Sequence, residues 1–204
     1  MTRAPVEGRV KTRLAAAVGS AQALRVHQEL LDHTLAEATG AELAPVSLWV
    51  DGDVSNPEIR RLVRKYAVPV HSQCGADLGE RMAYVFDRVL AHADFCVVVG
   101  SDCPPLDGSH LRGSCEALDA GRDLVIGPAE DGGYVLIGLR APHPVLFKAM
   151  PWGGDQVAKR TLAVAQGLAL DCEILAVLWD LDRAEDLRRY RQLGSPITGA
   201  AGGF

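Results

Sequence analysis

Aromatic residues are scarce in this chain, and neither sign of charge dominates it. Only 5% of the 204 residues are aromatic, and the formal net charge is −5 at pH 7. Proteins that hold single-stranded nucleic acid stack its bases on aromatic side chains, and dedicated nucleic-acid binders carry a basic face. The composition therefore argues against a nucleic-acid partner. A local phosphate pocket stays open, because it needs only a few basic residues.

The sequence also lacks paired cysteines and long apolar stretches. Its five cysteines are an odd number, and no two of them have the C-x-x-C spacing. No segment approaches the 18 or so uninterrupted apolar residues of a membrane span, and the N-terminus has no run of signal-peptide length. We therefore expect no disulfide framework, no structural zinc and no membrane segment, and we interpret the chain as a reduced, cytoplasmic protein.

Segments of strand and helix character alternate along the chain. Short apolar runs such as FCVVVG and YVLIGL are typical of strands buried on both faces, and amphipathic stretches between such runs favour helices, as over 20–40, 109–119 and 155–166. The pattern predicts a three-layer α/β/α sandwich with a mostly parallel central sheet. We expect one domain over residues 1–193 and a flexible tail, rich in glycine and alanine, over 194–204.

Acidic side chains follow three predicted strands at the point where each strand ends. FCVVVG is followed by Asp102, DLVIG by Asp131, and EILAVLW by Asp180 and Asp182. Ligands of open α/β sheets bind at the carboxyl ends of the strands, and carboxylates gathered there repel one another unless a cation lies between them. Mg²⁺ or Mn²⁺ is the expected cofactor, because magnesium binds through one or two carboxylates and fills its octahedron with waters and substrate phosphates.

Each of these carboxylates also has a purely structural interpretation. Asp102 precedes two prolines and suits a turn, and Asp131 begins an Asp-Gly-Gly segment that suits a hairpin. Asp182 precedes Glu185 by three residues and resembles a helix cap. If Asp182 is a cap, Asp180 is the freer metal ligand of the last pair, although one residue could do both.

Basic residues gather near the start of this acidic chain, in the segment GRVKTRL. The segment begins at Gly8 and carries Lys11 and Arg13, which alternate with apolar or hydroxyl residues. A glycine-led basic loop of this kind is a candidate phosphate-binding loop. Lys11 and Arg13 would neutralise the phosphate oxygens that the metal does not reach.

Three further residues are candidates for ligand contacts. Arg81 lies in the first turn of a predicted helix, where backbone N–H groups favour anions, although a surface salt bridge is the alternative. Trp152 stands in the glycine-flexible segment PWGGD and, with Tyr134, is a candidate for an acceptor pocket. The alternative for Trp152 is an ordinary core position.

Five motifs make the chain recognisable, and they occur in the order TRAPVEGRVKTRL, GADLGERM, VVVGSDCPPL, GPAEDGGYVLIGL and WDLDRAEDL. The chain resembles a bacterial family of nucleotide-diphospho-sugar-transferase-like proteins, which are often labelled glycosyltransferases and linked with arsenosugar or radical-SAM gene clusters. The proteins of this family look like distant relatives of molybdenum-cofactor and phospholactate guanylyltransferases. The resemblance runs from Met1 to about Leu193.

The resemblance implies a glycosyltransferase-A-like fold that binds a nucleotide through a divalent metal. By that resemblance Lys11 and Arg13 match the phosphate-facing loop, and Asp102 matches the metal-binding aspartate after the central strand. Asp131 lies in the motif that lines the reaction centre.

The chain departs from the family's pattern in two places, and the resemblance conflicts with the capping argument on the last acidic pair. It favours Asp182 over Asp180 as the second metal contact, whereas the capping argument favours Asp180. It implies an apolar first strand before the basic loop, but Met1 falls where that strand should be ending. It also implies a hydroxyl residue soon after Trp152, where this chain has Gly-Gly-Asp.

We therefore expect a metal-dependent transferase that acts on a nucleotide-activated donor and a small-molecule acceptor. The first hypothesis is a glycosyltransferase that uses a nucleotide-diphospho-sugar, with Asp131 as base or sugar-orienting residue. The second is a nucleotidyltransferase that joins a nucleoside triphosphate to a phosphorylated acceptor. The third is a protein that binds nucleotides without turning them over.

Overall fold

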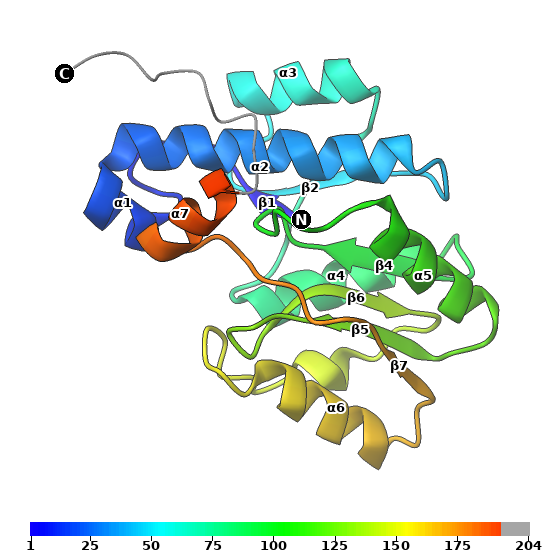
Figure 1. The fold of residues 1–204 in the computed structure, drawn as a ribbon. Coiled ribbons are helices and arrows are strands. Elements are labelled where there is room, and N and C mark those ends of the chain that lie inside the picture. Colours follow the sequence, from blue (N-terminus) through cyan, green and yellow to red (C-terminus); the bar gives the residue numbers. More distant parts are fainter. Residues whose placement is uncertain (193–204) are drawn as a thin grey trace.

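The structure is a computed structural model that describes residues 1–192 (Figure 1). The tail expected over 194–204 lies outside the described residues. No helix within residues 1–192 is both long and apolar enough to cross a bilayer.

The strands of the described chain form two sheets. The first is entirely parallel and has the order β1 (Thr2–Arg3), β2 (Leu48–Asp51), β3 (Val70–Ser72). The second has the order β4 (Cys96–Val99), β6 (Tyr134–Leu139), β5 (Leu124–Pro128), β7 (Cys172–Ile174). In it, β6 runs antiparallel to both of its neighbours, while β5 and β7 are parallel.

The beginning of the chain connects the two sheets. The Met1 nitrogen donates a hydrogen bond to the Val99 carbonyl at 2.6 Å, and the Ser101 hydroxyl donates to the Thr2 hydroxyl at 2.9 Å. These contacts place β1 beside the end of β4. The strand ends of both sheets therefore face a shared region.

Helices cover both faces of these sheets, which gives the three layers that the sequence predicts (Figure 1). One core lies between the sheets and α4 with α6, and another lies between the first sheet and α2 with α3. A third core includes apolar residues of α5, and a fourth joins α1, α2 and α7. The helices are α1 (Thr12–Val18), α2 (Ser20–Gly40), α3 (Pro57–Tyr66), α4 (Leu78–Leu90), α5 (Gly108–Asp119), α6 (Val157–Gly167), α7 (Ala184–Gln192) and the short 3₁₀ helix η1 (Pro144–Phe147).

Local sequence signals account for several helix starts. Asp77 accepts a hydrogen bond from the Glu80 nitrogen at 2.9 Å, and the Glu80 carboxylate accepts one from the Ala76 nitrogen at 2.7 Å. These two bonds cap α4 in a variant of the capping box, in which Glu80 binds the nitrogen of the residue before the N-cap. Pro57 occupies the first turn of α3, where its missing N–H costs no hydrogen bond.

Two strands differ from their predicted extent. The segment EILAVLW forms a regular strand only up to Ile174 and then follows β5 through scattered hydrogen bonds such as that from the Leu178 nitrogen to the Pro128 carbonyl at 2.9 Å. The register shifts between Gly127 and Pro128, and proline offers no N–H to a neighbouring strand, so the ladder becomes irregular there. β1 has two residues, which pair with Val50 and Asp51.

Candidate functional site

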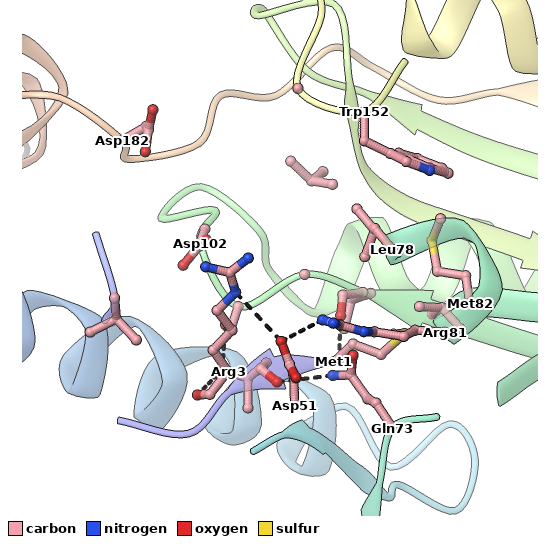
Figure 2. Close-up of a pocket in the computed structure, with 18 of the residues that line it drawn as sticks. Met1, Arg3, Asp51, Gln73, Leu78, Arg81, Met82, Asp102, Trp152 and Asp182 are labelled. Carbon is pink, nitrogen blue, oxygen red and sulfur yellow. Dashed lines mark hydrogen bonds and ion pairs between the residues drawn. The ribbon is translucent and has the colours of Figure 1, made fainter. Parts of the chain in front are cut away.

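A cavity of about 690 Å³ opens at the carboxyl ends of β1, β2 and β4 (Figure 2). This is the edge where ligands of open α/β sheets bind. Residues from the N-terminal loop, the strand ends, α4 and the segment before α7 line it, including Lys11, Asp51, Asp102, Trp152 and Asp182.

Lys11 and Asp102 form an ion pair at the inner wall of this cavity. The Lys11 Nζ atom lies 2.8 Å from Asp102 Oδ1 and donates a hydrogen bond to the Leu181 carbonyl at 2.5 Å. Only 4% of the Lys11 side chain is exposed. Lys11 also has a left-handed backbone, with φ 48°, which costs a non-glycine residue roughly 1–2 kcal/mol. The ion pair with Asp102 and the hydrogen bond to the Leu181 carbonyl thus hold this ammonium in place.

The two oxygens of Asp102 have different surroundings. Oδ1 is buried, whereas 48% of the whole side chain is exposed, so the exposed oxygen of the carboxylate is Oδ2. Burial alone would raise the pKa of Asp102, but the nearby charges of Lys11 and His27 outweigh it and hold the pKa below its usual value. Asp102 is therefore ionised and presents one free oxygen to the cavity.

His27, on α2, lies behind Asp102 and was not predicted as a site residue. Its Nδ1 is 3.9 Å from Asp102 Oδ1, and its Nε2 is 3.1 Å from the Arg3 carbonyl. Burial lowers its pKa. Nothing in the local sequence distinguishes it from any other histidine in a helix.

The segment that carries the last acidic pair lies against Asp102. The Leu181 nitrogen donates a hydrogen bond to the Asp102 carbonyl at 2.8 Å. Asp182 lines the cavity and forms an ion pair with Arg13, whose Nη1 lies 2.8 Å from Asp182 Oδ2. The structure thus brings together four predicted site residues, namely Lys11, Arg13, Asp102 and Asp182.

The capping role considered for Asp182 belongs to Asp186. Its Oδ2 accepts hydrogen bonds from the Asp182 nitrogen at 3.0 Å and from the Arg183 nitrogen at 2.7 Å. The Asp182 side chain is therefore not used at the start of α7 and faces Arg13 instead.

Asp180 is half-buried among other acidic groups. Burial raises its pKa to about 6, and repulsion from Asp131 and Asp102 adds to the shift, while Lys11 opposes it. Asp180 is not among the residues that line the cavity. A cation close to these carboxylates would lessen their mutual repulsion.

Two further predicted residues lie outside the cavity wall, like Asp180. Asp131 uses Oδ1 to accept a hydrogen bond from the Gly133 nitrogen at 2.8 Å, in the turn between β5 and β6, as its hairpin interpretation predicts. Gly8, with φ 74°, shapes the turn before α1 and does not reach the cavity either. Its neighbour in the motif, Lys11, does.

Arg81 lines the cavity, but its guanidinium is already paired. Nη1 donates to Asp51 Oδ2, and Nε donates to the Gly75 carbonyl at 3.1 Å. Arg3 Nε lies 3.6 Å from the same Asp51 oxygen. Asp51 ends β2 and thus follows the same strand-end rule as Asp102, but it was not predicted as a site residue.

Aromatic residues form the wall opposite the first sheet. The rings of Tyr134 and Trp152 meet edge to face with their centroids 6.4 Å apart, and both residues line the cavity. Trp152 lies on Gly79 of α4, where an added Cβ would come within 2.9 Å of the indole. The indole nitrogen of Trp152 is buried and has no hydrogen-bond partner within residues 1–192.

The thiol that follows Asp102 has no catalytic character. Cys103 is buried, and burial raises its pKa to about 12. Cys103 therefore stays protonated at neutral pH. It cannot act as a nucleophile in that state, because the thiolate is the nucleophilic form.

A divalent cation fits the donor set only with help from a ligand. Among the described residues, no three His, Cys, Asp or Glu side chains are close enough together to hold a metal ion. Magnesium needs only one or two carboxylates when substrate phosphates complete its coordination. The free Oδ2 of Asp102 and the cavity-facing carboxylate of Asp182 meet that requirement.

Comparison with solved structures identifies the fold. A protein from Desulfovibrio desulfuricans G20, provisionally named a nucleotide-diphospho-sugar transferase, is 28% identical, with a TM-score of 0.82 over 98% of this chain and 88% of that chain. The CTP complex of CMP:2-keto-3-deoxy-manno-octonic acid synthetase is 11% identical, with a TM-score of 0.51 over 78% of this chain and 86% of that one.

A third solved structure has the same architecture. Glucosyl-3-phosphoglycerate synthase from Mycobacterium tuberculosis, in complex with Mn²⁺, UDP and glucosyl-3-phosphoglycerate, is 13% identical, with a TM-score of 0.51 over 83% of this chain and 78% of that one. These likenesses confirm the predicted glycosyltransferase-A-like α/β fold. A search among curated proteins finds no match.

A comparison with protein families matches residues 34–154 to the family described as "Uncharacterized protein conserved in bacteria (DUF2064)". The matched segment includes β2, β4, Asp51 and Asp102. It spans more than half of the sequence, and the chain therefore belongs to this bacterial family.

Proposed function

We propose that this protein is a metal-dependent glycosyltransferase that transfers a sugar from a nucleotide-diphospho-sugar to a small acceptor. The observation that carries the proposal is the arrangement of Lys11, Arg13, Asp102 and Asp182 at one edge of the cavity. Two cations and two anions there suit a diphosphate and its counter-ion. The D. desulfuricans relative, which is named for the same donor class, supports the choice.

The reaction would replace one bond at the anomeric carbon of the sugar. The acceptor hydroxyl oxygen forms a bond to that carbon and loses its proton to solvent, the bond from the carbon to the diphosphate oxygen breaks, and the nucleoside diphosphate leaves with the electron pair. Negative charge grows on the leaving group. Preorganised cations at that position stabilise the transition state more than the ground state.

The residues of the cavity would divide this work. Lys11 is fixed by Asp102 and by the Leu181 carbonyl, so its ammonium needs no reorganisation to meet a phosphate oxygen. Arg13 is exposed and, among residues 1–192, pairs only with Asp182, so it can turn toward the leaving diphosphate. Asp102 and Asp182 would hold Mg²⁺ or Mn²⁺, which supplies Lewis-acid stabilisation of the phosphate oxygens when bound.

The aromatic wall would form the acceptor side. Tyr134 and Trp152 provide an apolar surface next to the cavity, and Leu78 and Met82 extend it. Burial raises the pKa of Tyr134, so its hydroxyl stays protonated. The Asp131 carboxylate accepts a hydrogen bond within its own turn, so it takes no part in this reaction.

Product analysis tests the proposal. Purified protein with Mg²⁺ or Mn²⁺ should release a nucleoside diphosphate from at least one sugar nucleotide of a panel when an acceptor mixture is present. Asp102→Asn should keep the fold and lose this metal-dependent turnover. Release of pyrophosphate from a nucleoside triphosphate with a phosphorylated acceptor would replace the proposal by nucleotidyl transfer. Thermal stabilisation by nucleotides without any product would replace it by binding alone.

A further inference from the structure

The aromatic wall of the cavity presents carbon to a ligand and keeps its polar atoms turned away. Tyr134 and Trp152 form this wall, and Leu78 and Met82 of α4 extend it. Figure 2 shows Trp152, Leu78 and Met82 on the side of the pocket away from Asp182. The orientation of the two aromatic side chains and the charges beside them indicate what this wall can bind.

The indole of Trp152 has its polar edge against the protein. Its Nε1 atom is buried, has no hydrogen-bond partner within residues 1–192, and lies on Gly79, where an added Cβ would be 3.1 Å from it. Trp152 as a whole is only half-buried and lines the cavity. The part of the indole that a ligand can reach is therefore carbon.

The hydroxyl of Tyr134 is also withdrawn from the cavity. It donates to the Met82 sulfur at 4.0 Å, and Met82 is buried. The rings of Tyr134 and Trp152 meet at an interplanar angle of 84°, so they form a corner between two apolar surfaces. Leu78, which is 45% exposed, adds a further apolar side chain at the cavity.

The charged groups beside this wall already have partners. α4 and the residue before it bring only Asp77 and Arg81 to the cavity lining. Asp77 caps α4, and Arg81 pairs with Asp51. Within residues 1–192, β6 and the segment of Trp152 add no charged residue to the lining. An anionic ligand would find no unpaired positive charge here, and an unpaired charge is costly to place against an apolar surface.

We propose that this wall binds an uncharged alcohol with an apolar body, and that this alcohol is the acceptor of the transferred sugar. The apolar body lies in the corner between Tyr134 and Trp152, where a flat ring contacts both aromatic surfaces. The hydroxyl faces the part of the cavity toward Lys11 and Asp102, where the donor diphosphate is proposed to bind. The inference rests on the proposed function and adds the chemical class of its acceptor.

Calorimetric titration with three probes tests the class directly. The probes are 2-naphthalenemethanol, 2-naphthoate, which has the same rings with a carboxylate, and glycerol 3-phosphate, which has hydroxyls and a phosphate but no apolar body. The alcohol should bind at least about tenfold more tightly than either anion, because neither anion finds a counter-charge at the wall. These probes leave the protein unchanged, so the result does not depend on how a variant folds.

A variant that adds a charge should reverse part of this preference. Leu78→Lys places an ammonium at an exposed position of the wall, so it should tighten the binding of 2-naphthoate about fivefold and weaken that of the alcohol. A gain of binding cannot result from a poorly folded protein. Val145→Lys makes the same change at a residue that is 44% exposed and lies outside the cavity, and it should alter neither affinity.

A product assay separates this inference from the proposed function. The panel of sugar nucleotides with Mg²⁺ should yield a sugar conjugate of 2-naphthalenemethanol, detected by mass spectrometry. Binding of either anion as tight as that of the alcohol, or transfer to a charged acceptor with none to the alcohol, would overturn the acceptor class and leave glycosyl transfer standing. Binding of the alcohol without consumption of any sugar nucleotide would overturn the proposed function, and with it the role of the alcohol as acceptor.

Discussion

Lys11 and Asp102, which lie far apart in the sequence, meet at 2.8 Å between Nζ and Oδ1, and the Lys11 side chain is almost fully buried. The same ammonium holds the Leu181 carbonyl, so one side chain links the N-terminal loop, the end of β4 and the segment before α7. The pair keeps a positive charge fixed at the place where a carboxylate oxygen opens to the cavity.

Replacement of Lys11 tests this link. Lys11→Met should lower kcat about 100-fold or more, because a fixed group that stabilises developing charge contributes on that scale. It should also lower the Tm, since Asp102 Oδ1 stays buried without its counter-charge. Steady-state kinetics and thermal melts measure both effects. Lys159→Met, an exposed position on α6, is the control, and a kcat for Lys11→Met equal to that of the control would remove Lys11 from the mechanism.

Asp180 gives a pH-dependent prediction for the metal-free protein. Its folded pKa of about 6 lies above its ordinary 3.8, so the folded state binds the proton more tightly than the unfolded state. The free energy of unfolding therefore falls as the pH rises from about 4 to about 6, and the penalty stays in place at higher pH.

Asp180→Asn removes that penalty. In EDTA the variant should be more stable than the wild type by about 1–3 kcal/mol at pH 8, and this advantage should vanish at pH 4. Urea unfolding at the two pH values measures the difference. A variant that is less stable than the wild type at pH 8 would show that ionised Asp180 does not destabilise the folded state.

Arg13 should affect binding far more than stability. The guanidinium is exposed, and its pair with Asp182 is of the surface type that contributes little to folding. Arg13→Ala should leave the Tm unchanged and raise the KM for the nucleotide donor about tenfold. Arg122→Ala breaks a comparable exposed pair with Asp171 outside the cavity and should leave both quantities unchanged. Equal kinetics in the two variants would count against a phosphate contact by Arg13.

Gly79 tests the support of the aromatic wall. A Cβ at this position would lie 2.5 Å from the Phe147 carbonyl and 2.9 Å from the Trp152 indole. Gly79→Ala should therefore cost about 1–3 kcal/mol of stability, although alanine favours the helix by about 1 kcal/mol. It should also raise the KM for the acceptor, because Trp152 must shift.

The matched control for this variant is Gly113→Ala on α5. The nearest atom to a Cβ there is the Leu175 Cδ2 at 4.0 Å, which is an ordinary contact. This variant should gain up to about 1 kcal/mol, because only the helix preference changes. Denaturant unfolding compares the two, and a Gly79→Ala protein as stable as Gly113→Ala would mean that Trp152 does not rest on α4.

Local signals predicted most of the fold and the residues that meet around Lys11 and Asp102. The period of apolar residues predicted a helix over 20–40, which is α2, and the strand-end rule identified Asp102 and Asp182. These predictions succeed because each depends on residues close together in the chain, or on the common edge of a parallel sheet.

The rest of the site depends on pairings that no local pattern contains. Arg81 and Asp51 meet only because α4 folds back over β2, and His27 comes near Asp102 only through the packing of α2. Asp131 is the opposite case, since its Asp-Gly-Gly sequence serves the turn in which it lies. Antiparallel β6 was also not foreseen as a feature of the sheet, because a buried apolar run has no direction of its own.

The most direct test of the account is a crystal structure with Mn²⁺ and a nucleoside diphosphate, in which anomalous scattering locates the metal. We predict a manganese peak at coordination distance from Asp102 Oδ2 and from a phosphate oxygen, with Lys11 Nζ in contact with the diphosphate. Manganese bound elsewhere, or a nucleotide bound outside the cavity between Asp51 and Asp182, would contradict the account.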